Sequence, residues 1–262
     1  MSRFDSDASI GEHIMELLMR IRKMVLILVL ATVAVLIVPI DLASLNLSWT
    51  EPVYNTLATV VINRLLSDLL PSNVQLLPMD WFAPFMIYIY TSLFIGLVIS
   101  SPVIVYELYK FFSPALYSHE RKYILTFTGA FTGLFLFGIS MGYFVVVPIT
   151  FRMLVSSTYL LNLPPTYEFT SFFSIVLGLL TVSGLMFTFP VFFILLVKLG
   201  IVKTTMITNA RKIVYIGIFI IICIFTPDPT IVTDVILFLP IFVLMEASIL
   251  IGKRIERQAT PK

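Results

Sequence analysis

Six apolar segments alternate along the chain with shorter stretches that hold most of the charged residues. Several of these segments reach the roughly 20 residues that an α-helix needs to cross a bilayer. The pattern therefore predicts an all-α polytopic membrane protein with six transmembrane helices, which form a single membrane domain over residues 1–262. The predicted spans lie at about 24–40, 82–106, 123–147, 169–197, 213–225 and 235–252.

Composition supports this class. Hydrophobic residues make up 59% of the chain and charged residues 12%, and the mean hydropathy is +1.02. A soluble domain carries about 25% charged residues. Composition therefore excludes a soluble globular domain and makes membrane lipid a partner of the chain.

The basic residues lie in four places that predict the topology. Of the 17 Lys and Arg, all but Arg64 and Arg152 precede the first span, separate spans two and three or four and five, or follow the last span. Basic residues mark the cytoplasmic side of membrane proteins. Both termini are therefore predicted to be cytoplasmic. The net charge of +2 gives no sign of a nucleic-acid partner.

Two amphipathic segments are predicted outside the spans. Residues 12–23 form a short cytoplasmic helix whose polar side carries Glu16 and Arg20 at i, i+4 spacing. The outer loop 41–80 is too long for a simple connection and contains a second helix. Pro52 suits the first turn of that helix, which we expect to lie on the outer face and cap the bundle.

Prolines and glycines mark the third and fourth spans. Pro148 is expected to close the third span, and Pro190 to kink the fourth. The third span also contains two pairs of glycines at i, i+4 spacing, which let another helix approach closely. They serve either packing within one subunit, which we favour, or a contact between subunits. The pairs are Gly129 with Gly133 and Gly138 with Gly142.

The last two spans are predicted to be short. Residues 213–225 form a helix of about 20 Å at 1.5 Å per residue, against about 30 Å of hydrocarbon. Two such helices must thin the bilayer or lie sheltered inside the bundle. A hairpin that does not span the membrane is an alternative, because it would also place both of its basic flanks on one side.

The sequence carries no recognisable catalytic or cofactor motif. It lacks a Walker A loop, a dinucleotide fingerprint and a zinc motif, and its two histidines, His13 and His119, lie beside cytoplasmic basic residues. No cofactor or metal is expected, and an enzyme embedded in the membrane is disfavoured. With no visible means of using ATP, any transport would draw its energy from a gradient or a partner.

Three acidic residues stand out by their position. Glu16 and Glu120 lie on an otherwise basic cytoplasmic face, where a carboxylate suits a cationic ligand such as guanidinium. Alternatively, Glu16 pairs with Arg20 on its own helix, and Glu120 complements the N-terminal end of the third span. Glu246 lies within the sixth span, where an unpaired charge is costly. Three interpretations of Glu246 are open. It has a functional role, it forms a hydrogen bond within the bundle as a protonated acid, or it faces the inner membrane interface.

The stretch 101–123 carries a specific resemblance. Its sequence, SPVIVYELYKFFSPALYSHERKY, closely resembles the central cytoplasmic loop of the TatC family, the signal-peptide receptors of the twin-arginine protein translocase. The family pattern P-A-L-Y-x-H-E is matched by Pro114, Tyr117, His119 and Glu120. The resemblance extends over about residues 12–254.

Three other family patterns are found in the chain. Residues 12–17, EHIMEL, are similar to the family's N-terminal pattern H-L-x-E-L-R, and Glu16 stands at the glutamate. Pro52 matches a proline of the first outer loop. Asp228 matches the acid of the T-P-x-D connection between the last two helices.

The chain departs from the family pattern at two positions. Leu18 replaces the arginine that follows E-L in the N-terminal pattern. Thr188 stands where the family often has a glutamate or glutamine in the fourth span. A threonine there can still supply a hydroxyl to a partner helix.

The resemblance implies a receptor and core subunit of a twin-arginine translocase. Glu16 and Glu120 would bind the paired arginines of signal peptides, together with Phe111 and His119. The partners would be signal peptides of folded substrate proteins and small single-span subunits of the TatA and TatB type, in an oligomer in the plasma membrane of a prokaryote. Transport would draw on the proton-motive force. The competing hypothesis is a small-solute secondary transporter. Glu246 and Pro190 support this hypothesis, and the missing internal repeat counts against it.

Overall fold

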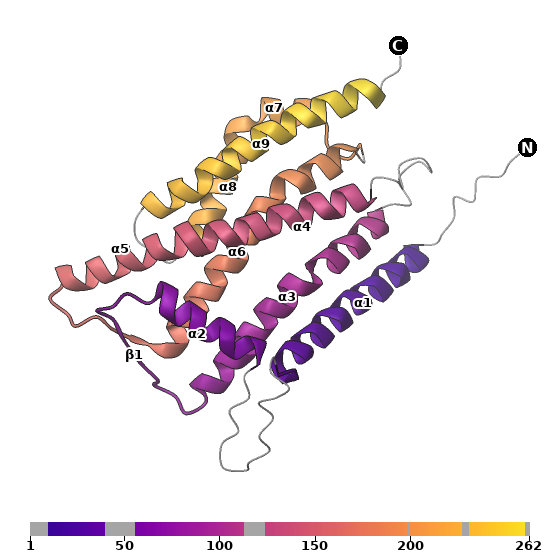
Figure 1. The fold of residues 1–262 in the computed structure, drawn as a ribbon. Helices are drawn as coiled ribbons and strands as arrows, with labels where there is room; N and C mark the ends of the chain where they lie inside the picture. Colours follow the sequence, from indigo (N-terminus) through magenta and orange to yellow (C-terminus); the bar gives the residue numbers. More distant parts are fainter. Residues whose placement is uncertain (1–9, 40–55, 113–123, 199, 227–230, 260–262) are drawn as a thin grey trace, which may run out of the picture.

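Long helices that lie side by side form the body of the protein (Figure 1). The computed structural model describes residues 10–39, 56–112, 124–198, 200–226 and 231–259. In chain order the elements are α1 (Ile10–Ile37), α2 (Leu57–Leu69), β1 (Gln75–Leu77), α3 (Ala83–Phe112), α4 (Ile124–Met141), the π-helix η4 (Gly142–Val146), α5 (Val147–Leu160), β2 (Thr166–Glu168), α6 (Phe169–Lys198), α7 (Thr204–Asn209), α8 (Arg211–Phe225) and α9 (Ile231–Ala259).

The predicted class, an all-α polytopic membrane protein, is confirmed. Within the described residues, 4 helices are long and apolar enough to cross a membrane: Ala83–Lys110, Ile124–Leu160, Phe169–Lys198 and Ile231–Glu256. The first predicted span lies in α1, whose N-terminal half is charged, and the fifth lies in α8, which has 15 residues. Both therefore have less uninterrupted apolar length than the roughly 20 residues that a simple span needs.

The N-terminal helix is longer than the sequence suggested. The amphipathic helix at 12–23 and the span at 24–40 were expected as separate segments, but both lie in the continuous helix α1. The sequence from Glu12 to Val38 contains no proline or glycine that would end a helix, and the first proline after it is Pro39. The charged turn that carries Glu16 is therefore rigidly continuous with the apolar part of the helix.

The prediction that Pro148 closes the third span was wrong. The helix runs on from α4 through η4 into α5, as one apolar unit from Ile124 to Leu160, and Pro148 lies in the first turn of α5. A proline inside a helix removes one backbone donor and clashes with the preceding turn. The wider π turn directly before it accommodates the ring without ending the helix. The residues that follow the predicted end of this span are consequently helical as far as Leu160.

The last two spans differ from each other in length. With 15 residues, α8 is about 22 Å long, short as expected. The expectation of a short sixth helix was wrong, because α9 has 29 residues and is about 44 Å long. It continues beyond the apolar segment 235–252 into the basic C-terminal residues, where a helix in water tolerates charge.

The connections between α1 and α3 and between α5 and α6 contain α2 and a small sheet. Thr56 is the N-cap of α2, and its hydroxyl accepts a hydrogen bond from the backbone N–H of Thr59 at 3.4 Å. The helix thus begins at Leu57, so the prediction that Pro52 lies in its first turn was wrong. Pro52 itself lies outside the described residues. Strands β1 and β2 pair in parallel, with Gln75 opposite Thr166 and Leu77 opposite Glu168; the sequence did not predict this contact. The buried residues of α2 form one stripe: Ala58, Ile62, Leu65 and Leu69.

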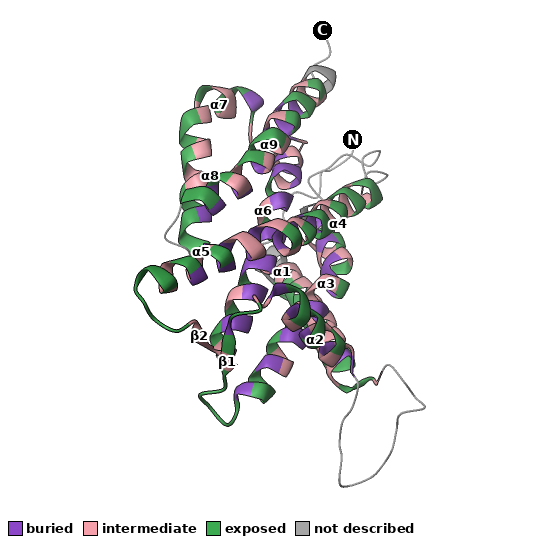
Figure 2. Ribbon diagram, turned by 60° about the vertical axis from the view of Figure 1, so that its left-hand side comes forward, coloured by how far each residue is buried: buried purple, intermediate pink, exposed green. Residues whose placement is uncertain are grey.

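Helix α6 lies at the centre of the bundle (Figure 2). Of its most apolar window 56% is buried, against 33–39% in the other three long apolar helices. A Cβ atom at Gly138 of α4 would lie 2.6 Å from the Ser183 carbonyl oxygen and 2.9 Å from the Gly184 Cα atom of α6. One glycine pair therefore packs within the subunit, as favoured, whereas a Cβ at Gly129 or Gly133 would meet no described atom within 4 Å.

Candidate functional site

Glu16 and Arg20 lie one turn apart on α1 and form an ion pair. The Arg20 guanidinium donates from Nη2 to Glu16 Oε1 at 2.5 Å and from Nε to the same oxygen at 3.1 Å. This is the i, i+4 pairing expected from the spacing. Because both nitrogens face one carboxylate oxygen, the guanidinium is held in a defined orientation.

Arg20 also reaches a second carboxylate on a different helix. Its Nη1 atom donates to Glu107 Oε2 of α3 at 3.2 Å. The side chains of Arg20 and Glu107 are 14% and 13% exposed, and that of Glu16 is 34% exposed. Two carboxylates thus share one guanidinium in this group of three side chains, hereafter the Arg20 cluster.

A close approach of α1 and α3 supports the Arg20 cluster. The two helices lie side by side (Figure 1). A Cβ atom at Gly96 of α3 would lie 2.5 Å from the Thr32 hydroxyl and 2.9 Å from the Thr32 backbone nitrogen of α1. Only a glycine allows this contact without a shift of one helix.

The Arg20 cluster lies next to the beginning of the motif-rich central segment. Glu107 lies one turn before Phe111, so both positions are on the same face of α3. The structure does not describe the side chain of Phe111, and four residues of the resemblance lie outside the described residues: Pro114, Tyr117, His119 and Glu120. The described geometry therefore brings Glu16 to the helix end that leads into this segment.

Glu246 has partners that the sequence could not identify. The Tyr215 hydroxyl of α8 donates to Glu246 Oε1 of α9 at 2.5 Å. Arg211 Nη1 lies 3.6 Å from the same oxygen, within ion-pair range, but beyond the usual length of a hydrogen bond. The Tyr215 ring also contacts Phe242, with 4.8 Å between the ring centroids. Glu246 thus joins α9 to the short helix α8.

Thr188 uses its hydroxyl within its own helix. It is buried, and its Oγ1 donates to the carbonyl oxygen of Leu185 at 2.6 Å. Pro190 lies two residues further on, inside α6. In this structure the hydroxyl is therefore engaged locally and does not point to another helix as a donor.

Asp234 is a candidate that the sequence analysis missed, whereas Asp228 lies outside the described residues. Asp234 is buried in the first turn of α9 and accepts hydrogen bonds from the Thr226 hydroxyl and, at 3.2 Å, from Cys223 Sγ. An acid in the first turn also complements the helix dipole. The available signal was an acid inside an apolar stretch, shortly after a threonine and two prolines.

Asp68 links α2 to the π-helix. Tyr143 Oη donates to Asp68 Oδ2 at 2.5 Å, and Arg64 Nε lies 2.9 Å from the same oxygen. The hydrogen bonds from Tyr143 and Ser67 hold the pKa of the Asp68 carboxyl below its ordinary value. The link is exposed.

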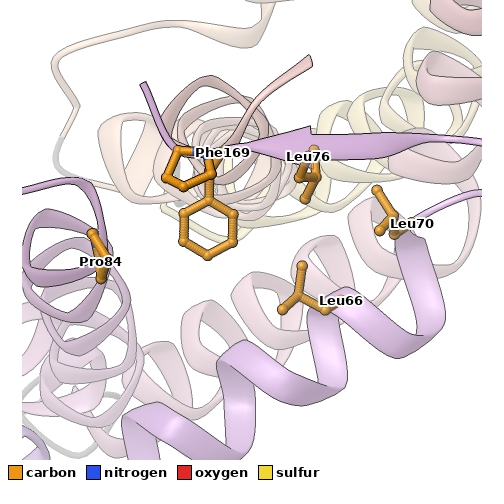
Figure 3. A pocket seen from close by; sticks show the side chains of 6 residues that line it. Leu66, Leu70, Leu76, Pro84 and Phe169 are labelled. Atoms are coloured by element: carbon orange, nitrogen blue, oxygen red, sulfur yellow. The ribbon is translucent and has the colours of Figure 1, made fainter. Parts of the chain in front are cut away.

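An apolar pocket of about 510 Å³ lies beneath β1, between α2, α3 and α6 (Figure 3). Carbon side chains line it, so it offers no group that would bind a guanidinium. The lining residues are Leu66, Leu70, Leu76, Pro78, Pro84 and Phe169. Within the described part of the chain, no three His, Cys, Asp or Glu side chains are placed to hold a metal ion.

Comparison with known proteins gives consistent matches over most of the chain. The family model described as Sec-independent protein translocase protein (TatC) matches residues 12–240. The TatCy protein of Bacillus subtilis is 33% identical over 67% of this chain and 69% of its own. The TatC protein of Methanocella arvoryzae is 29% identical over 95% of both chains. A crystal structure of the twin-arginine translocase receptor TatC superposes with a TM-score of 0.74 at 28% identity, over 94% of this chain and 100% of that one.

Proposed function

The chain belongs to the TatC family of Sec-independent protein translocase proteins, and on this premise we propose that it is the signal-peptide receptor of a twin-arginine translocase. It is a multi-pass membrane protein and a translocase subunit, not an enzyme. Its ligand is the pair of arginines in the signal peptide of a folded substrate protein. Transport draws on the proton-motive force.

The observation that carries this proposal is the Arg20 cluster. A guanidinium already lies between the carboxylates of Glu16 and Glu107, so this site has the chemistry that an arginine of a signal peptide requires. The cluster holds two carboxylates for one guanidinium, and the Glu16 side chain is 34% exposed. These properties favour a cationic ligand over a neutral or anionic one.

Further residues enter the proposal through the family resemblance. Glu120, Phe111 and His119 would complete the binding site beside Glu16, because they match the family's central loop. Pro52, Pro114 and Tyr117 would shape the outer loop and that central loop.

The arrangement of the helix ends supports the proposed topology. The start of α1, the end of α3, the start of α4 and the end of α9 lie at one end of the bundle, and α2 with β1 lies at the other (Figure 1). Most of the basic residues of the described helices belong to the first end, and Arg64 of α2 and Arg152 of α5 are the exceptions. We therefore place both termini in the cytoplasm of a prokaryotic cell, with the protein in the plasma membrane.

Single-span subunits of the TatA and TatB type are the proposed protein partners, in an oligomeric translocase. The polar residues in or near the last spans are candidates for contact with them: Thr188, Asp228 and Glu246. The transporter hypothesis loses its main support, because Glu246 has Tyr215 and Arg211 as partners.

The experiment that tests the proposed function is a binding measurement. Purified protein in detergent is titrated with a signal peptide that carries Arg-Arg and with the same peptide carrying Lys-Lys. A guanidinium forms bidentate hydrogen bonds with carboxylates and an ammonium does not, so tighter binding of the Arg-Arg peptide is expected. Equal affinities in a folded sample would contradict the receptor function.

A further inference from the structure

We infer that Arg20 occupies the signal-peptide site of the free receptor, and that an arriving arginine displaces it from Glu16 and Glu107. Glu107 is then a further carboxylate that contacts the signal peptide. This inference rests on the proposed function and adds to it a built-in competitor and one more specificity residue.

The contacts of Arg20 are those expected of a bound arginine ligand. It donates to Glu16 from Nε and Nη2 and to Glu107 from Nη1. The arrangement uses all three nitrogens of the guanidinium, a planar donor group that pairs well with carboxylates. A peptide arginine would need the same oxygens, so the two guanidinium groups compete.

The structure also allows Arg20 to leave. The close contact between Gly96 and Thr32 holds α1 against α3 independently of the ion pairs. Glu16 is 34% exposed and so gives a ligand access to the cluster.

Glu107 has the position that a contact residue requires. It projects from the last turns of α3 toward Arg20 of α1, one turn before Phe111, and its side chain is largely buried. A largely buried carboxylate is costly unless a cation pairs with it. Glu107 therefore needs a guanidinium in both states, from Arg20 in the free receptor and from the peptide in the complex.

The decisive variant is Arg20→Gln, measured with Arg-Arg and Lys-Lys peptides. A ligand can bind only to those sites that Arg20 has left, so its apparent affinity is reduced in proportion to the fraction of such sites. Removal of Arg20 should therefore tighten binding of the Arg-Arg peptide by about three- to tenfold. Arg20→Lys should lie between wild type and Arg20→Gln, because an ammonium competes less well for two carboxylates. Unchanged or weaker binding of the Arg-Arg peptide by folded Arg20→Gln would overturn the inference.

A matched control removes the effect of net charge. Arg22 lies on the same helix and is exposed, so Arg22→Gln makes the same charge change at a position outside the contacts of Arg20. It should alter the affinity of both peptides by about twofold or less, since exposed charges are screened by salt. If Arg22→Gln increased the affinity for the Arg-Arg peptide as much as Arg20→Gln, the increase would come from the change in net charge. That result would overturn the proposed displacement of Arg20.

The role of Glu107 is tested in the background of Arg20→Gln. If Glu107 contacts the peptide, adding Glu107→Gln should weaken binding of the Arg-Arg peptide by about tenfold, the effect of one charge-assisted hydrogen bond. If Glu107 only anchors Arg20, the added change has no effect, and Glu107 is not a contact residue.

Failure of the inference and failure of the proposed function give different results. Wild-type protein that does not prefer Arg-Arg over Lys-Lys contradicts the receptor function itself. Wild-type protein with this preference, but with weaker binding after Arg20→Gln, contradicts only the displacement. Size-exclusion chromatography and thermal unfolding of each variant show that the compared samples are folded.

Discussion

Two helix pairs in this protein join a glutamate to an arginine, and they do so differently. In the pair α1–α3, Arg20 lies within 3.2 Å of Glu16 and Glu107. In the pair α8–α9, Arg211 lies 3.6 Å from Glu246, and the short contact of 2.5 Å comes from the Tyr215 hydroxyl. The first group holds two carboxylates for one guanidinium, whereas the second holds one carboxylate for one guanidinium.

We propose that this difference separates a site that binds a ligand from a contact that stabilises the fold. A guanidinium between two carboxylates can be exchanged for another guanidinium, since both make the same charge-assisted hydrogen bonds. A tyrosine hydroxyl offers no such exchange. On the proposed function, the same residue types, glutamate and arginine, serve recognition in one helix pair and the anchoring of a short helix in the other.

The largest expected effect is on the packing of α1 against α3. A Cβ atom added by Gly96→Ala would meet the Thr32 backbone nitrogen at 2.9 Å, and overpacking of this kind costs about 1–3 kcal/mol. Thermal unfolding in detergent should show a clearly lowered midpoint, accompanied by weaker peptide binding.

The matched control lies in the other helix pair. A Cβ atom at Gly217 of α8 would meet no described atom within 4 Å, so Gly217→Ala should be neutral or stabilise the helix by about 0.5–1 kcal/mol. Equal destabilisation by both substitutions would refute the role assigned to the contact at Gly96.

The next effect concerns the anchor of α8. Tyr215→Phe removes the hydroxyl that donates to Glu246 and should cost about 1–2 kcal/mol, because a hydrogen bond to a charged or acidic group is lost. The unfolding midpoint should fall, and affinity for the Arg-Arg peptide should stay within about twofold of wild type.

Tyr159→Phe is the corresponding control, since this side chain is exposed at the end of α5 and surface changes lie within about 0.5 kcal/mol. A loss of peptide binding in Tyr215→Phe without a loss of stability would show that the α8–α9 contact also takes part in recognition.

The smallest effect is expected at the exposed link between Asp68 and Tyr143. The pKa of Asp68 lies below its ordinary value of 3.8, so its stabilising contribution is present above that value and is lost as the pH falls through the lowered pKa. At pH 6 the unfolding midpoint of the wild type should therefore be slightly higher than that of Tyr143→Phe. The two midpoints should converge as the pH falls below 3.8. A difference that persists in acid would assign the effect of Tyr143 to packing instead.

The helices predicted well are those bounded by abrupt changes in polarity. The predicted spans 169–197 and 213–225 agree closely with α6 and α8. The errors occur where the ends were placed at prolines or charges, as at Pro148 and at the ends of α9. A π turn accommodates the proline, and a helix that leaves the membrane continues in water.

The polar contacts follow a similar division between local and distant partners. The pairing of Glu16 with Arg20 follows from helix geometry and was predicted. The partners of Arg20 and Glu246 on other helices are separated by 87 and 31 residues in sequence. Such contacts depend on how the helices pack, which periodicity and charge patterns do not specify.

The central claim is that the carboxylate of Glu16 recognises the guanidinium of the signal peptide, and a double-mutant cycle tests it most directly. The cycle combines Glu16→Gln in the receptor with Arg-Arg→Lys-Lys in the peptide, and Glu246→Gln serves as the control receptor. We predict that Glu16→Gln weakens binding of the Arg-Arg peptide by about tenfold or more and abolishes the preference for arginine. Glu246→Gln should keep the affinity and the preference of the wild type. A full preference for arginine in folded Glu16→Gln would contradict the account.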